Sequence, residues 1–103
     1  MILRGIGVSS GIVKGKVKFY SNDAFVSEDD IFVAYSTNPS MAHSMARAKA
    51  IITQRGGILS HAAIFCRELG IPCVVGVEGL LDKIMEGTEV IVDGEKGTIE
   101  VVN

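Results

Sequence analysis

A stretch in the middle of the chain constrains its fold more than any other. Gly56 and Gly57 precede Ser60, from which a helical pattern runs to Leu69 before Gly70 interrupts it. Serine is a preferred helix N-cap residue, because its hydroxyl accepts a hydrogen bond from an unpaired amide of the first turn. Glycine just after the last turn is a common helix terminator. The sequence therefore predicts a glycine turn followed by a short, capped helix.

His61 falls in the first turn of this predicted helix. Amides there lack partners within the helix, and the helix dipole adds partial positive charge. A helix N-terminus behind a glycine turn is a common anion site. An imidazole in that place can carry a phosphoryl group as a covalent adduct, with backbone amides bonding its oxygens. His61 is therefore the candidate catalytic residue, although a structural hydrogen bond is the simpler interpretation of an isolated histidine.

Apolar runs and helical patterns alternate through the middle of the chain. The predicted strands are residues 31–35, 50–53 and 73–77, and the predicted helices between them are residues 40–49 and 60–69. This alternation predicts parallel strands joined by right-handed crossovers. The flanking patterns predict a half-buried strand at residues 12–20, a brief helix at 80–85, and a hairpin of residues 89–93 and 98–102. We expect the first strand and the hairpin to form a second, antiparallel layer.

Two predicted loops leave the carboxyl ends of these parallel strands, where ligand sites usually lie. They contain residues 37–39 and 56–60. If their strands are neighbours, Thr37 lies close to His61. A threonine hydroxyl there bonds an imidazole nitrogen and fixes its tautomer and orientation. Thr37 is therefore the candidate orienting residue.

Other residues near the predicted site have two interpretations. Gly56 and Gly57 either supply a turn with positive φ or let the backbone approach a phosphoryl group, and both can hold. Arg55 is near enough to meet a phosphate, but a solvated surface role is at least as common. Arg67 lies about 240° around the helix from the histidine, so we expect it to anchor the helix or contact a partner domain. His43 has no motif around it and is interpreted as structural.

The central stretch resembles the phosphohistidine motif of the PEP-utilising enzymes. This group contains PEP synthase, pyruvate phosphate dikinase, enzyme I of the sugar phosphotransferase system and rifampicin phosphotransferase. The resembling residues are Gly56-Gly57, Ser60-His61-Ala62-Ala63, Arg67-Glu68-Leu69-Gly70-Ile71-Pro72 and Val74-Val75-Gly76. Weaker likeness is found in Gly5-Ile6-Gly7 with Ser9-Ser10-Gly11 and in Val92-Asp93-Gly94 with Gly97. The resemblance therefore covers essentially the whole chain, but only the mobile domain of that family.

The resemblance implies an α/β fold, namely a three-layer β/β/α swivelling domain with a central parallel sheet and a second antiparallel layer, over residues 1–103. It implies a phosphoryl-carrier domain that shuttles a phosphoryl group on His61 between donor and acceptor sites. Gly56, Gly57 and Ser60 would bind or orient the phosphate. Leu59 stands where many members have threonine, so any part played by that hydroxyl is missing.

The implied partners are nucleotide-binding domains of the ATP-grasp type and PEP- or pyruvate-binding domains. Mg²⁺ and ATP or PEP are expected there, and neither a cofactor nor a metal is expected in this chain. The chain would then be a phosphotransferase component and not a complete enzyme. The alternative is a non-catalytic regulatory or interaction module with the same fold.

Size and charge exclude several other classes of function. A chain of 103 residues forms one domain, and a formal net charge of -2 provides no basic patch for nucleic acid. No apolar run reaches the roughly 18 residues of a membrane span, and the N-terminus lacks a signal peptide's apolar core. We therefore expect a cytoplasmic protein. Cys66 and Cys73, seven residues apart, do not match a metal-ligand spacing and are expected to be small buried thiols.

Overall fold

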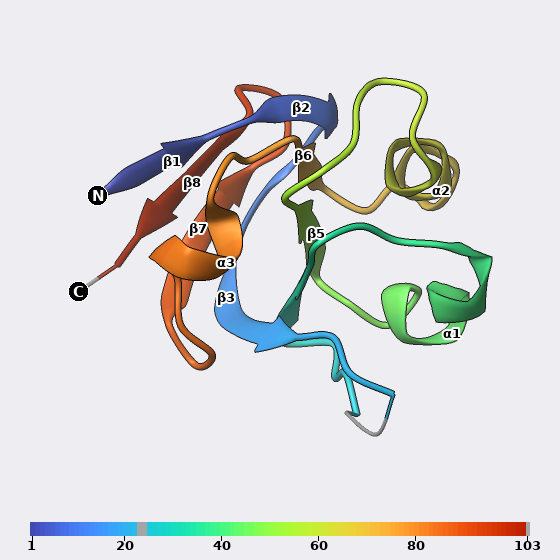
Figure 1. Ribbon diagram of the computed structural model, residues 1–103, viewed down its shortest axis with the longest axis horizontal. Coiled ribbons are helices and arrows are strands. Elements are labelled where there is room, and N and C mark those ends of the chain that lie inside the picture. Colours follow the sequence, from blue (N-terminus) through green and yellow to red (C-terminus); the bar gives the residue numbers. More distant parts are fainter. Residues whose placement is uncertain (23–24, 103) are drawn as a thin grey trace.

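The computed structural model describes residues 1–22 and 25–102, so three residues of the expected domain (23, 24 and 103) lie outside it. Eight strands form one mixed sheet in the order β1-β8-β7-β3-β4-β5-β6-β2 (Figure 1). The strands are β1 (Ile2–Arg4), β2 (Ile6–Ser9), β3 (Ile12–Phe19), β4 (Asp30–Ala34), β5 (Ala50–Thr53), β6 (Cys73–Val75), β7 (Glu89–Asp93) and β8 (Thr98–Val101). The helices are the 3₁₀ turn η1 (Pro39–Met41), α1 (Ala42–Met45), α2 (His61–Leu69) and α3 (Leu80–Lys83).

The predicted parallel strands are confirmed. β4 pairs with β5 in the register Ile31↔Ala50, and β5 pairs with β6 in the register Ile51↔Cys73. The helix predicted over residues 40–49 is shorter than expected, because it consists of η1 and α1 alone. The amide of Lys49 donates to the carbonyl oxygen of Asp30 at 2.9 Å, which draws the chain out of the helix and into β5.

Strand alternation divides the apolar side chains between two cores. Successive residues of a strand point to opposite faces, so Ile31 and Val33 of β4 join one cluster while Phe32 joins the other. The first cluster contains residues of β1 and of β3 through β8, together with Leu80 of α3. The second lies between the sheet and helices α1 and α2, seen at the right of Figure 1. Because both faces of the sheet are covered, the sequences of the parallel strands β4, β5 and β6 are nearly continuous runs of apolar residues.

The expected second, antiparallel layer is not a separate sheet. β3 pairs in parallel with β4 on one side and antiparallel with β7 on the other, which joins both groups of strands into one sheet. β3 has eight residues, long enough to pair along both edges.

β1 and β2 were not predicted, because each is short and they are separated only by Gly5.

The sheet curves until its two edges meet. β1 lies at one edge and β2 at the other, although the chain passes from one to the other through Gly5 alone. The amide of Gly5 donates to the carbonyl oxygen of Gly97 at 2.8 Å, and that of Gly94 donates to Gly11 at 2.8 Å. A Cβ built on Gly94 would collide with the carbonyl oxygen of Ser9. Glycine is therefore required where β2 crosses the β7–β8 hairpin.

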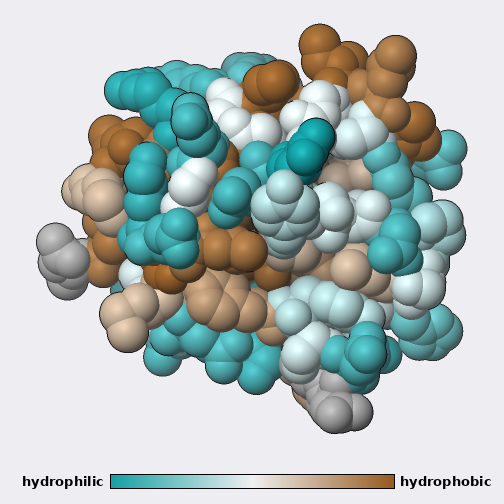
Figure 2. Space-filling model, viewed as in Figure 1, coloured by the Kyte–Doolittle hydropathy of each residue, from teal (hydrophilic) through white to brown (hydrophobic). Residues whose placement is uncertain are grey.

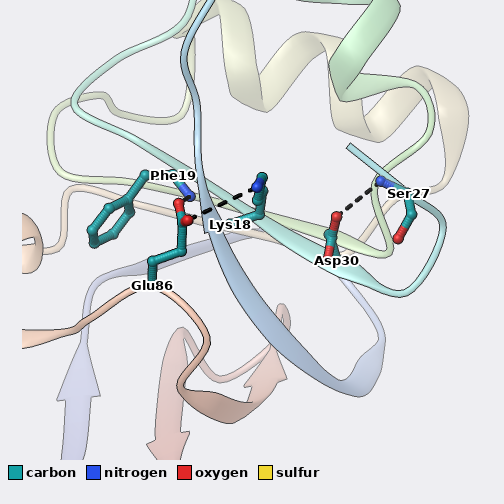
Figure 3. Close-up of polar contacts among 5 residues, drawn as sticks. All are labelled: Lys18, Phe19, Ser27, Asp30 and Glu86. Carbon is teal, nitrogen blue, oxygen red and sulfur yellow. Dashed lines mark hydrogen bonds and ion pairs between the residues drawn. The ribbon is translucent and has the colours of Figure 1, made fainter. Parts of the chain in front are cut away.

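Polar side chains fasten the loops around β3 and β4. The Glu86 carboxylate accepts a hydrogen bond from the Phe19 amide at 3.1 Å and lies 3.8 Å from Lys18 Nζ (Figure 3). Asp30 accepts from the Ser27 amide at 2.9 Å. An exposed ion pair contributes little to stability, so these contacts position loops more than they stabilise the fold. No helix among the described residues is long and apolar enough to cross a membrane.

Candidate functional site

Helix α2 is capped at both ends as predicted. Ser60 has extended backbone angles, and its Oγ accepts a hydrogen bond from the Ala63 amide at 3.3 Å. Gly70 has a φ of 71°, the left-handed conformation that glycine adopts without strain, and its amide donates to the carbonyl oxygen of Cys66. His61 is therefore the first residue of the helix, at its positive end.

Thr37 and His61 are in hydrogen-bond contact, as the topology predicts. Thr37 Oγ1 lies 2.8 Å from His61 Nδ1, and both residues are half-buried. The two loops run side by side because pairing continues past β4 and β5. The amide of Gln54 donates to the Ala34 carbonyl at 3.1 Å, and that of Arg55 to the Tyr35 carbonyl at 2.8 Å.

A hollow of about 240 Å³ opens beside the imidazole ring. It is lined by Ser36, Thr37, Arg55, Gly56, Ser60, His61 and Ala62. The structure therefore brings four of the five candidate site residues together around one space. The fifth, Gly57, is outside the lining. His43 is also outside it, on α1, where its side chain is exposed.

The two glycines before α2 differ in what they require. Gly56 has a φ of 131°, and a Cβ there would lie 3.1 Å from Ser60 Oγ, so the turn needs glycine. Gly57 does not have positive φ, and a Cβ on it would meet nothing within 4 Å. The expectation of positive φ is therefore correct for Gly56 and wrong for Gly57.

The two arginines near the site have different contacts. Arg67 donates to the carbonyl oxygens of Val8 at 3.3 Å and Ile58 at 2.8 Å, which confirms that it anchors α2 to β2 and to the preceding loop. Arg55 instead lies beside Tyr35, with Nη1 3.4 Å from the phenol oxygen. That contact raises the pKa of Arg55 above its already high ordinary value. Sequence reasoning missed this pair, because the contact depends on the register of two strands: Tyr35 ends the strand predicted over residues 31–35, and Arg55 lies two residues past the one predicted over 50–53.

The two cysteines are buried and free. A hydrogen bond with Cys66, together with burial, raises the pKa of the Cys73 thiol. The Cys73 thiol therefore stays protonated at neutral pH, and both cysteine side chains pack in the core between the sheet and the helices. The described residues contain no group of three His, Cys, Asp or Glu placed to hold a metal ion.

Sequence comparison identifies relatives over nearly the whole chain. Residues 26–97 match the family model described as PEP-utilising enzyme, mobile domain. Phosphoenolpyruvate synthase of Pyrococcus furiosus is 48% identical over 102 residues, which is 96% of this chain and 12% of that protein. Rifampicin phosphotransferase of Bacillus subtilis is 37% identical, over 94% of this chain and 11% of that protein. The chain thus spans a small part of the curated relatives it matches.

Solved structures share the fold. Aconitase X of Thermococcus kodakaraensis superposes with a TM-score of 0.74 over 100% of this chain and 99% of that chain, but at 18% identity it shows the fold alone. The structure titled Enzyme I (nEIt) has a TM-score of 0.63 and 33% identity over 77% of this chain and 32% of that chain. The family model matches well over half of the chain, and the relative from Pyrococcus furiosus is 48% identical in sequence over 96% of the chain. The chain therefore belongs to the family of PEP-utilising enzyme mobile domains.

Proposed function

We propose that this chain is the phosphoryl-carrier domain of a PEP-utilising phosphotransferase and that His61 carries the phosphoryl group. The observation that supports this most is the contact of 2.8 Å between Thr37 Oγ1 and His61 Nδ1 at the start of α2, beside an open hollow. One ring nitrogen is held and the ring is only half-buried. Such a ring is oriented for attack, whereas a purely structural histidine needs no adjacent space.

The Thr37 contact fits either tautomer of the neutral imidazole, because the threonine hydroxyl both donates and accepts. The proposed carrier uses the tautomer in which Nδ1–H donates to Thr37 Oγ1, which leaves the lone pair on Nε2. A bond then forms between Nε2 and phosphorus, while the bond between phosphorus and the donor's leaving oxygen breaks and that oxygen keeps the electron pair. Because Nδ1 retains its proton, the modified ring carries a positive charge, which makes the phosphoryl group easy to pass on.

Backbone amides of α2 would bond the phosphoryl oxygens. Ser60 already accepts hydrogen bonds from the amides of Ala63, through Oγ, and Ile64, through its carbonyl oxygen. The amides of His61 and Ala62 are the first-turn donors left for an anion. The turn at Gly56 keeps the approach to them open, and the space beside Gly57 adds room.

The donor and acceptor would be partner domains, of the nucleotide-binding ATP-grasp type and of the PEP- or pyruvate-binding type, working in the cytoplasm with Mg²⁺ and ATP or PEP. Two observations support docking at this site. The chain spans only 12% of a relative named phosphoenolpyruvate synthase. Hydrophobic side chains also gather over the loop before α2, at the upper right of Figure 2, where Ile58 is 63% and Leu59 83% exposed. Leu59 stands where many members of the family have threonine, and it would supply an apolar contact to the partner domain in place of that hydroxyl.

The curved sheet is also compatible with the family's layered architecture. We propose that its two halves and the helix pair α1 and α2 correspond to the β, β and α layers of a swivelling domain. The alternative of a non-catalytic module is not favoured, because it gives no role to the oriented imidazole and its hollow.

The proposal is tested by incubating the chain with isotope-labelled PEP or ATP and candidate donor domains, followed by mass spectrometry. We expect one phosphoryl group, located on His61. If no donor domain of either type labels the chain, the non-catalytic module becomes the better interpretation.

Replacing Thr37 with valine tests the orienting contact. Thr37→Val keeps the shape of the side chain and removes its hydroxyl, and one hydrogen bond contributes about 1 kcal/mol. We expect phosphoryl transfer to His61 to slow roughly five- to tenfold, with the fold intact and the melting temperature lower by only about 4–8 °C. Quench-flow measurement of the labelling rate decides this. Thr88→Val, the same change outside the hollow, is the control, and a wild-type rate in Thr37→Val would show that the contact is idle.

A further inference from the structure

The backbone of Arg55 is fixed, whereas its side chain is held loosely. Its amide donates to the Tyr35 carbonyl at 2.8 Å, and its carbonyl accepts from the buried Thr53 hydroxyl at 2.7 Å. The guanidinium lies 6.0 Å from the centre of the Tyr35 ring, and Nη1 is 3.4 Å from the phenol oxygen. The first distance is at the outer limit of a cation–π contact, and the second is long for a hydrogen bond. The side chain is therefore free to exchange partners.

Arg55 is also the cation that an anion in the His61 hollow would meet. Among the residues lining that hollow, Arg55 is the single Lys or Arg. Arg67, the other arginine nearby, already donates to the carbonyl oxygens of Val8 and Ile58. A phosphoryl group brings a charge of about −1.5 to −2 and three acceptor oxygens. Guanidinium–phosphate hydrogen bonds are shorter and stronger than those to a neutral phenol.

We propose that Arg55 leaves Tyr35 and binds the phosphoryl group when His61 is phosphorylated. This rests on the proposed carrier function and adds a residue to it. The fixed backbone places the start of the side chain at the rim of the hollow, and the exposed guanidinium needs only to rotate about its own side-chain bonds. Tyr35 loses its contact at the same time, so its ring reports the phosphorylation state of the histidine.

The test uses phosphoramidate, a small chemical phosphoryl donor that needs no partner domain. Its P–N bond breaks as the N–P bond to histidine forms, and ammonia leaves. Mass spectrometry follows the rates at His61 and at the exposed His43 in the same sample, so His43 serves as an internal reference. In wild-type protein we expect His61 to react faster than His43, and NMR signals of the Tyr35 ring to shift as His61 becomes modified.

We expect Arg55→Gln to lower the ratio of the His61 rate to the His43 rate by about five- to tenfold, because one charge-assisted contact is lost. Arg55→Lys should restore part of it, since the charge remains without the planar fork. Arg47→Gln is the matched control, because Arg47 also lies over an aromatic ring, 5.0 Å from that of Phe25, but not at the hollow. Its His61 rate and Tyr35 shift should match the wild type.

The outcomes separate this inference from the proposed function. If His61 reacts at the same rate in Arg55→Gln as in wild type, or if the Tyr35 signals do not move on phosphorylation, Arg55 does not bind the phosphoryl group. If wild-type His61 reacts no faster than His43, the hollow has no special reactivity, and both the carrier function and the role of Arg55 are overturned.

Discussion

His61→Ala is expected to abolish phosphoryl labelling of the chain by a donor domain while leaving the fold intact. Labelling is lost because the nucleophilic nitrogen is removed. The fold survives because the ring is half-buried, is hydrogen-bonded to Thr37 and lies tilted beside Phe65, with 5.8 Å between the ring centres. Little apolar area is lost at such a position. Mass spectrometry after incubation with labelled PEP or ATP measures the first result, and thermal melting measures the second.

The control for this experiment is the other histidine. His43→Ala should label like the wild type, because His43 lies outside the hollow. The group on His61 should also be stable in base and labile in acid, as a phosphoramidate is. Label on a serine or threonine, or label that persists in His61→Ala, would show that the carrier assignment is wrong.

The sequence predicts the geometry around His61 because the determinants of that geometry are local or follow from simple topology. Ser60 and Gly70 mark the two ends of α2 by their side-chain and backbone chemistry, and both caps are present. The contact of Thr37 with His61 follows from placing two loops at the same end of adjacent parallel strands. The roles proposed for these residues in phosphoryl transfer stay predictions.

The parts that could not be predicted depend on contacts between distant segments. β1 and β2 have only three and four residues, and their partners, β8 and β6, lie far along the chain. No local pattern shows that Gly5 lets the chain pass between the two edges of one sheet. The pairing of Arg55 with Tyr35 is of the same kind, because it depends on strand register and not on spacing.

Gly94→Ala is expected to destabilise the fold more than any other single methyl addition at the described glycines. The added Cβ would collide with the carbonyl oxygen of Ser9 and lie 3.0 Å from the amide nitrogen of Cys73. Both are backbone atoms, which cannot rotate away as a side chain can. Overpacking of this kind costs about 3 kcal/mol, a large part of the stability of a small domain. The melting temperature should then fall by more than about 10 °C.

This change also tests how the closed sheet supports the site. Ser9 Oγ donates to the carbonyl oxygen of Cys66 in α2 at 3.3 Å, so displacement of β2 disturbs the helix that begins at His61. Gly57→Ala is the matched control, because its Cβ would enter open space, and its stability should stay within about 0.5 kcal/mol of the wild type. If Gly94→Ala melted like Gly57→Ala, β2 would not cross the hairpin as closely as described. The joined edges of the sheet would then not be what holds α2 in place.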